Sequence, residues 1–314
     1  MTPAPLSCGI IGTGKFAHVH AQALAQSLVC RLAVVMDAEK TKAQAFALQW
    51  QCTTADTIPA LLAMCPAIVT LATPNHLHKE HIAEIMHSPH APKLLIVEKP
   101  LCTTAEDLRA IGELVRASPT YLVVDHSRRF NSGFADLQKL IRSGSLGKDV
   151  LSVQWKYYAG WLHTGVHVVD TLRMLIGEMK VRAAYNPRVD RFADDPLLDV
   201  ELSSVGHPKA AIHLFGVPEH PYASFEGEIM LSNGRIRIQW DDLFVDALVD
   251  ESALPRFVVK EHRTADPVAT ALRTLYAKCA ALINEEDKSL LNDAGFATAR
   301  GTMKILLEAK ALVA

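Results

Sequence analysis

The sequence CGIIGTGKFA, residues 8–17, joins a short apolar run to a glycine cluster, and the amphipathic stretch 18–28 follows. This order predicts a strand, a tight turn and a helix. In such a turn Gly12 permits the bend, Gly14 lets a ligand pyrophosphate approach the backbone, and Ala17 keeps the helix close to the strand. The helix N-terminus offers free N–H groups and the positive end of its dipole to phosphates. The pattern G-x-G-x-x-A therefore predicts a dinucleotide-binding turn made by Gly12, Thr13, Gly14, Lys15, Phe16 and Ala17.

Asp37 supports this interpretation because it ends the next apolar run, 32–36, and lies 25 residues after Gly12. An acidic side chain near that offset binds the ribose hydroxyls of the dinucleotide. A helix N-cap before Ala38 is an alternative role, and the two roles are compatible. A phosphate-loop NTPase is excluded: residues 9–15 match G-x-x-x-x-G-K, but Phe16 stands where Ser or Thr should hold magnesium.

The composition favours a folded protein of two domains that binds small molecules. The chain has 314 residues, 49% of them hydrophobic and 21% charged, which is typical of globular domains with their own cores. A net charge of −2 provides no basic field for nucleic acid or for an anionic membrane. We therefore expect small-molecule substrates and copies of the same subunit as partners.

The termini and cysteines bear on the compartment. The start of the chain lacks the basic and apolar regions of a secretion signal, and no apolar run approaches the length of about 18 residues that a membrane span requires. The six cysteines form no C-x-x-C pair and are expected to be reduced core residues. The expected location is the cytoplasm.

The pattern of apolar and polar residues changes near residue 125. Before it, short apolar runs at 67–72, 94–97 and 121–125 alternate with amphipathic helices, which predicts a parallel sheet covered on both faces, a doubly wound Rossmann domain over residues 1–125. After it, strand-like segments alternate between helices, and Ser232-Asn233-Gly234 is a hairpin turn. Residues 126–314 are therefore predicted to form an α+β domain on an open, mostly antiparallel sheet. The predicted strands are 151–158, 181–189, 198–205, 210–215, 224–231, 235–240 and 257–260, and the predicted helices are 135–143, a compact stretch ending at 177, 266–284 and 292–313.

Two candidate chemical sites follow strands of the first domain. Glu98-Lys99-Pro100 ends a buried strand, where a charged pair is costly unless it is used or paired; a simple Lys99–Glu98 ion pair is the alternative. The run from Ala72 to His78 ends another strand. His76, His78 and His81 lack the spacing of a metal-binding motif, so no metal site is predicted, and they are expected to line the cofactor crevice.

The third candidate site lies in the second domain. If the chain is helical from His163, then His163, His167 and Asp170 share one face at i, i+4 and i+7. Satisfied core histidines are the alternative. Four aromatic residues precede the site and could stack on a sugar ring or pack into the core: Trp155, Tyr157, Tyr158 and Trp161.

At these residues the sequence resembles the glucose-fructose oxidoreductase and inositol dehydrogenase family (Gfo/Idh/MocA). The resemblance rests on the glycine turn, Ala72-Thr73-Pro74-Asn75 with His78, Glu98-Lys99-Pro100, Arg129-Phe130, Gly144 to Gly147, and Gly165-x-His167-x-x-Asp170. It implies a nicotinamide dinucleotide on the first domain, held by the glycine turn, Asp37, the 72–75 run, His78, Glu98 and Lys99. It also implies substrate between the domains, Lys99 and His167 as the proton-transfer pair, and a second-domain sheet that supports a homodimer or homotetramer.

One departure concerns His163, because many catalytic members of the family carry an acidic residue four positions before the histidine. We expect His163 to bind substrate, together with Tyr158 and Trp161, while Asp170 orients His167. The predicted reaction is NAD(P)-dependent hydride transfer to or from a sugar, nucleotide-sugar or cyclic polyol, with NAD preferred because Asp37 repels a 2′-phosphate. The alternatives are a dinucleotide-binding regulator without turnover and an enzyme acting on a dihydrodiol or a tetrapyrrole.

Overall fold

The computed structural model describes residues 4–219, 222–248, 257–264 and 268–313. These residues form two compact units. The first comprises Met1–Phe130 and Pro267–Met303, and the second comprises Asn131–Asp266 and Lys304–Ala314. Within the described ranges, no helix is both long and apolar enough to cross a membrane.

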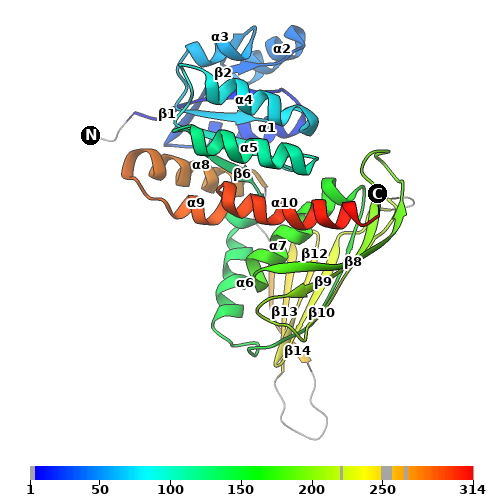
Figure 1. The fold of residues 1–314 in the computed structure, drawn as a ribbon. Helices are drawn as coiled ribbons and strands as arrows, with labels where there is room; N and C mark the ends of the chain where they lie inside the picture. The colour runs from blue at the N-terminus through cyan, green and yellow to red at the C-terminus, as the bar shows by residue number, and fades with distance from the viewer. Residues whose placement is uncertain (1–3, 220–221, 249–256, 265–267, 314) are drawn as a thin grey trace, which may run out of the picture. The chain divides into compact units, whose positions relative to one another are not determined.

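A parallel sheet of six strands in the order β3-β2-β1-β4-β5-β6 forms the centre of the first unit (Figure 1). Every residue of β4 and β5 is buried, because helices cover both faces: α1 contacts α2, and α4 contacts α3 and α5. The strands are β1 (Leu6–Ile11), β2 (Cys30–Met36), β3 (Thr53–Ala55), β4 (Ile68–Leu71), β5 (Leu94–Glu98) and β6 (Tyr121–Asp125). The helices are α1 (Lys15–Ala25), α2 (Lys40–Trp50), α3 (Ile58–Ala63), α4 (His78–His87) and α5 (Ala105–Ala117). The predicted doubly wound fold is confirmed; β3 and α3 were not predicted.

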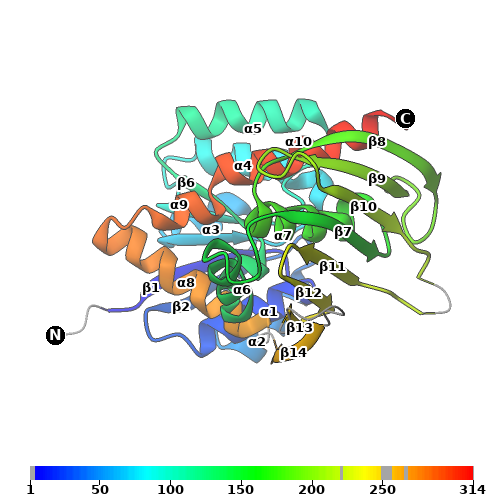
Figure 2. The ribbon, with the colours of Figure 1, turned by 90° about the horizontal axis from the view of Figure 1, so that it is seen from below.

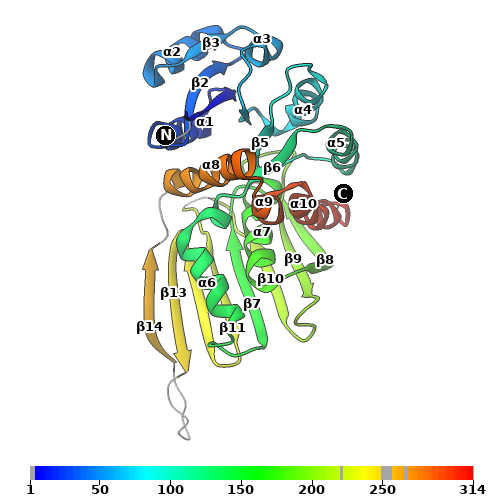
Figure 3. The ribbon, with the colours of Figure 1, turned by 90° about the vertical axis from the view of Figure 1, so that its left-hand side faces the viewer.

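The tail of the chain returns to this first unit, which differs from the predicted division at residue 125. Helix α8 (Val268–Glu285) packs against α1 and against the short turn η2 (Ser127–Phe130), and α9 (Ser289–Ala294) contacts β6. Figure 3 shows α8 beside α1. Tyr276 and Cys279 of α8 are completely buried in the core of this unit. The amphipathic pattern of 266–284 predicted a helix but could not show which sheet its apolar face covers. Its predicted start at residue 266 lies outside the described residues.

The second unit is built on an eight-stranded sheet in the order β14-β13-β12-β11-β7-β10-β9-β8, and Figure 2 shows its strands from β8 to β11 side by side. All neighbours are antiparallel except β7 and β10, which are parallel. The mostly antiparallel sheet and the hairpin at Ser232 are thereby confirmed. The strands are β7 (Val150–Tyr157), β8 (Met179–Arg188), β9 (Leu197–Ser204), β10 (Ala211–Gly216), β11 (Glu226–Leu231), β12 (Gly234–Gln239), β13 (Asp242–Leu248) and β14 (Phe257–Thr264).

Helices α6 (Ser132–Arg142) and α7 (Val166–Ile176) lie on one face of this sheet (Figure 3). Side chains of β7 alternate accordingly, with Val153, Trp155 and Tyr157 buried and Gln154 and Lys156 exposed. Helix α10 (Phe296–Ala311) follows Gly295, so the predicted helix 292–313 is two helices, and the boundary between the units falls within α10.

Candidate active site

A cavity of about 580 Å³ lies at the carboxyl ends of β1, β2 and β4, where the strand order reverses. Ligands of doubly wound sheets bind at this position. The lining residues are Ile11, Gly12, Thr13, Gly14, Met36, Asp37, Ala38, Glu39, Lys42, Ala72, Thr73, Pro74, Leu77 and His81. The structure therefore brings together, in one cavity, the predicted glycine turn, Asp37 and the run that begins at Ala72.

The two glycines of the turn have different structural roles. Gly12 has a φ of +93°, and a Cβ there would lie 2.6 Å from the carbonyl oxygen of Ala72, so the turn needs a residue without a side chain. Apart from Gly14 and its two chain neighbours, no atom of the described residues lies within 4 Å of the place where a Cβ of Gly14 would be. Gly14 is the N-cap residue of α1, whose first turn has neither a side-chain cap nor an acidic residue. The open space and the uncapped N–H groups fit a pyrophosphate.

Asp37 joins the first two turns of the sheet. Its Oδ2 accepts hydrogen bonds from the backbone N–H and the hydroxyl of Thr13, both at 2.7 Å, and its Oδ1 accepts from Glu39 N–H at 2.9 Å. Burial alone would raise the pKa of Asp37, but the hydrogen bonds from Glu39 and Thr13 and the charge of Lys42 lower it. Asp37 is therefore an anion beside the cavity. It is not the N-cap of α2, which is Glu39.

Other predicted cofactor residues lie outside this cavity, and some lining residues were not predicted. Lys15 and Phe16 are exposed in the first turn of α1, and half-buried Asn75 begins the short turn η1 (Asn75–Leu77). His81 lines the cavity as the sequence suggested, with its Nδ1 3.1 Å from the Thr73 hydroxyl. Leu77, Glu39 and Lys42 carry no local motif that marks them.

His78 is a structural residue beside the cavity. It is 1% exposed, with Nε2 3.0 Å from the carbonyl oxygen of Thr73 and Nδ1 3.1 Å from that of Pro100. Burial lowers the pKa of His78. Because its ring lies between the turn after β4 and the turn after β5, His78 positions both turns. The sequence predicted that His78 lines the cavity, but it is not among the lining residues.

The Glu98-Lys99-Pro100 motif lies at the end of β5 as predicted, with Glu98 as the last residue of the strand. Lys99 is half-buried. The Glu98 carboxylate is 7% exposed, accepts a hydrogen bond from Lys99 N–H at 3.3 Å, and lies 2.9 Å from Nε2 of His20. Glu98 is thus held by His20 of α1. An ion pair between Lys99 and Glu98 alone does not explain this contact.

The candidate residues of the second unit lie on two kinds of helix. Gly165 N–H donates to the Gly160 carbonyl five residues earlier, so η3 (Trp161–Gly165) is a π-helical turn, and regular α-helix begins at Val166. His163 therefore does not have the predicted α-helical spacing to His167. His163 is exposed, His167 is half-buried and Asp170 is 2% exposed.

Asp195 holds this π-helical turn in place, and no local pattern predicted it. Its two carboxylate oxygens accept the backbone N–H groups of Leu162 and His163, each at 2.8 Å. Burial raises the pKa of Asp195 although these two hydrogen bonds favour its anion. The His163 ring also packs on Phe192, with centroids 4.7 Å apart. The loop between β8 and β9 thus positions His163.

The aromatic residues before η3 mostly belong to the core. Trp155, Tyr157 and Trp161 are at most 1% exposed. The Trp161 indole donates to the carbonyl of Leu306 at 2.8 Å. The prediction that Trp161 stacks on substrate is corrected, because its ring is enclosed by the unit's own residues. Tyr158 is half-buried beside Trp240, with ring centroids 5.5 Å apart.

Comparisons with known proteins give the following similarities. Residues 6–126 match the model of the oxidoreductase family with an NAD-binding Rossmann fold, GFO_IDH_MocA. The chain is 32% identical over 141 residues to inositol 2-dehydrogenase of Rhizobium meliloti, covering 45% of this chain and 42% of the relative. It is 26% identical over 215 residues to scyllo-inositol 2-dehydrogenase (NAD(+)) of Bacillus subtilis, covering 60% of each. The chain thus spans about half the length of these curated relatives. An NAD binding oxidoreductase of Klebsiella pneumoniae has the same fold over 99% of this chain and 97% of its own, with a TM-score of 0.80 at 14% identity.

Proposed function

Because residues 6–126 match the model of the oxidoreductase family with an NAD-binding Rossmann fold, we propose that the protein is an NAD(P)-dependent dehydrogenase or reductase. Its proposed substrate is a sugar, nucleotide-sugar or cyclic polyol, in line with the inositol dehydrogenases that it resembles. The observation that carries the proposal is the cavity at the glycine turn, where open space at Gly14 and an uncapped helix meet the Asp37 carboxylate.

The proposed chemistry divides between cofactor and protein. A nicotinamide dinucleotide held at the glycine turn and Asp37 would supply the hydride chemistry. Lys99, half-buried after β5, accepts the hydroxyl proton during oxidation and returns it during reduction. We assign His167 a hydrogen bond to the substrate oxygen and Asp170, one turn along α7, the orientation of His167. Exposed His163 is assigned to a substrate hydroxyl.

NAD is the proposed preferred cofactor. The Asp37 anion would repel the 2′-phosphate of NADP. The two nearby lysines that could attract this phosphate both have carboxylate partners, Asp56 for Lys40 at 2.9 Å and Glu39 for Lys42. Their charges are therefore partly compensated.

A substrate panel with a matched lysine pair tests this proposal. Purified protein is mixed with NAD or NADP and a set of sugars, nucleotide-sugars and inositols, and reduction is followed by nicotinamide absorbance. Lys99→Ala should lower kcat roughly 10²- to 10⁴-fold with little change in NADH affinity. The control is Lys93→Ala, an exposed lysine just before the opposite end of β5, and it should retain wild-type kinetics.

Two results would contradict the proposal. If Lys99→Ala loses NADH affinity but keeps kcat at saturation, Lys99 binds the cofactor and is not the base. If wild-type protein binds NADH tightly and no member of the panel is converted, the regulator without turnover becomes the better assignment.

The second unit is proposed to form a homodimer or homotetramer through its sheet. Side chains on the face that α6 and α7 do not cover include Gln154 and Lys156 of β7 and Phe215 of β10, which is 37% exposed. Light scattering of the purified protein should give twice or four times the mass of the 314-residue chain. A monomer at micromolar concentration would contradict this. The cytoplasmic location expected from the sequence stays a prediction.

A further inference from the structure

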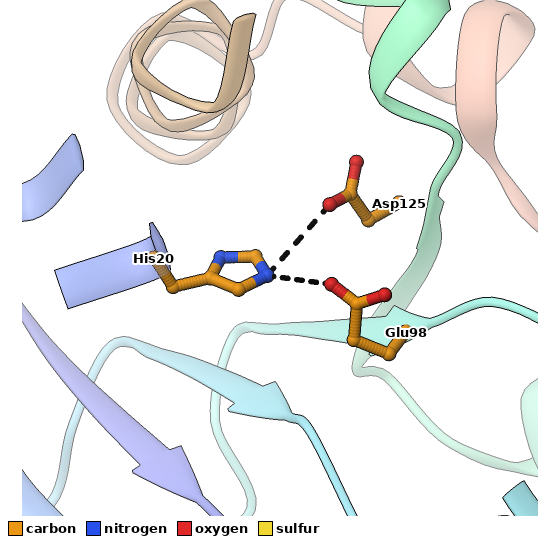
Figure 4. A group of neighbouring side chains, drawn as sticks. All are labelled: His20, Glu98 and Asp125. Atoms are coloured by element: carbon orange, nitrogen blue, oxygen red, sulfur yellow. Dashed lines mark hydrogen bonds and ion pairs between the residues drawn. The ribbon is translucent and has the colours of Figure 1, made fainter. Parts of the chain in front are cut away.

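Three buried ionisable side chains meet where β5 and β6 end, directly before Lys99. They are His20 of α1, Glu98 of β5 and Asp125 of β6, and they are 0%, 7% and 2% exposed (Figure 4). Burying such groups is unfavourable unless they are paired and hydrogen-bonded. The arrangement therefore needs a physical explanation, which the fold alone does not provide.

His20 is held from both ring nitrogens. Its Nε2 lies 2.9 Å from Glu98 Oε1 and 3.7 Å from Asp125 Oδ2. Since an ionised carboxylate only accepts, Nε2 donates to Glu98. Nδ1 lies 3.0 Å from the hydroxyl of Tyr276, which is 2.8 Å from the hydroxyl of Thr70. A continuous hydrogen-bonded chain thus runs from β4 through α8 and α1 to Glu98, and it sets the orientation of the ring.

The surroundings shift the pKa values of the two carboxyl groups in opposite directions. Burial and the neighbouring Glu98 charge raise the pKa of Asp125 well above its usual range. Burial alone would also raise the pKa of Glu98, but the hydrogen bond from His20 and the charges of His20 and Lys99 lower it. The surroundings therefore favour the ionised form of Glu98 and the protonated form of Asp125. The Lys99 charge acts on both groups.

We propose that this cluster is a positioning site for Lys99: His20 fixes the buried Glu98 carboxylate through their 2.9 Å contact, and that carboxylate accepts the Lys99 backbone N–H and presents its negative charge to Lys99. This proposal rests on the proposed function only in so far as Lys99 is the group that exchanges the substrate proton. Loss of the Glu98 charge, directly or through loss of the His20 hydrogen bond, would make Lys99 release its proton at lower pH.

Among the described residues, further ionisable groups also act on the cluster, and burial favours their neutral forms. From α8 these are Tyr276 and Cys279, whose pKa values burial raises well above their usual ranges. From α4 it is His78, whose pKa burial lowers. Glu98 is therefore the group whose ionisation depends on the hydrogen bond from His20.

A divalent cation is the other occupant that this group of residues suggests. One ligand atom from each of His20, Glu98 and Asp125 lies within 4.8 Å of the others. The direct hydrogen bond between His20 and Glu98 and the raised pKa of Asp125 favour a metal-free cluster, since a cation would require both carboxylates ionised and Nε2 without its proton.

Titration of Lys99 itself tests the proposal without any substrate. The rate of Lys99 acetylation by acetic anhydride, measured by peptide mass spectrometry across pH, reports the pKa of its amine. Relative to wild type, Glu98→Gln and His20→Leu should lower this pKa by about one unit or more. His20→Gln, which keeps an N–H donor for Glu98, should shift it by less than half as much. The matched control is His18→Gln on the same helix, where His18 accepts from the Trp50 indole, and Lys99 should titrate there as in wild type.

The comparison separates positioning from structural loss. Circular dichroism and urea unfolding establish that each variant is folded. Glu98→Gln, which preserves the shape of the side chain, keeps the test valid if His20→Leu does not fold. In an active enzyme the acidic limb of the kcat/KM profile for substrate oxidation should move to lower pH by the same amount as the Lys99 titration. An unchanged Lys99 pKa in folded Glu98→Gln would overturn the proposal, as would stoichiometric metal in wild type that Glu98→Gln lacks. Absence of turnover would leave the Lys99 titration interpretable, so the two proposals can fail separately.

Discussion

Replacing each glycine of the turn by alanine should separate folding from dinucleotide binding. At Gly14 the new methyl group would contact no protein atom within 4 Å, and the φ of −68° is one that alanine adopts readily. At Gly12 the methyl group would lie 2.6 Å from the carbonyl oxygen of Ala72, at a φ of +93°. The two substitutions are chemically identical and only two residues apart, so each is the control for the other.

The expected magnitudes follow from these contacts. In Gly14→Ala, the weaker N-cap and the reduced freedom of the unfolded chain oppose each other, so the free energy of unfolding should change by less than about 1 kcal/mol. The methyl group would occupy the space assigned to the pyrophosphate, and NADH affinity should fall at least about 10-fold. In Gly12→Ala, the left-handed backbone costs about 1–2 kcal/mol and the clash adds about 1–3 kcal/mol, so the protein should be clearly destabilised.

Urea unfolding and NADH fluorescence titration measure both quantities for both variants. The expected pattern is stable but weakly binding protein for Gly14→Ala, and destabilised protein for Gly12→Ala. Wild-type NADH affinity in Gly14→Ala would refute the placement of the pyrophosphate at this turn. Wild-type stability in Gly12→Ala would show that the turn can move away from Ala72, contrary to the structure.

Three further predictions concern charged or polar positions. Asp37→Ser should improve NADP affinity relative to NAD by about 10-fold or more. Because the lowered pKa keeps Asp37 ionised and a 2′-phosphate with a second pKa of about 6 is also ionised, the wild-type preference for NAD in binding titrations should change little between about pH 7 and 8. His163→Asn should mainly raise KM for the substrate, since an amide keeps the hydrogen bond; a kcat loss as large as that of Lys99→Ala would place His163 in proton transfer. Asp246→Asn should lower the free energy of unfolding by about 1–3 kcal/mol at pH 7, because Asp246 is completely buried against Arg235 and Arg237, whose side chains are about a third exposed. Hydrogen bonds and charges from these arginines outweigh the effect of burial and lower the pKa of Asp246. The contribution of Asp246 to the free energy of unfolding is therefore complete above the unfolded pKa of about 4 and is lost as the pH falls through the folded pKa. A stability difference between wild type and Asp246→Asn that persists at pH 2 would contradict this.

The local parts of the fold and site could be predicted from the sequence. The glycine turn, the acid after the second strand and the apolar runs of the first sheet are signals within a few residues of one another, and each corresponds to one turn or one buried strand. The structure confirms the doubly wound sheet and the mostly antiparallel second sheet, and the match over residues 6–126 confirms the family resemblance. Strand β13 escaped prediction because Asp246 interrupts its apolar pattern, and only its arginine partners on β12 make that burial tolerable.

Contacts between segments that are distant in the sequence were decided by the tertiary structure alone. His20 and Glu98 are 78 residues apart and His20 and Tyr276 are 256 apart, so no spacing rule connects them. Tertiary packing likewise places α8 in the first unit. It also brings Asp195 to the backbone N–H groups of the π-helical turn. The sequence determined which segments could form strands, turns and amphipathic helices, because these depend on local periodicity and backbone freedom. Which buried polar groups meet depended on the whole fold, since a buried carboxylate is tolerated only where other segments bring it a donor or a counter-charge.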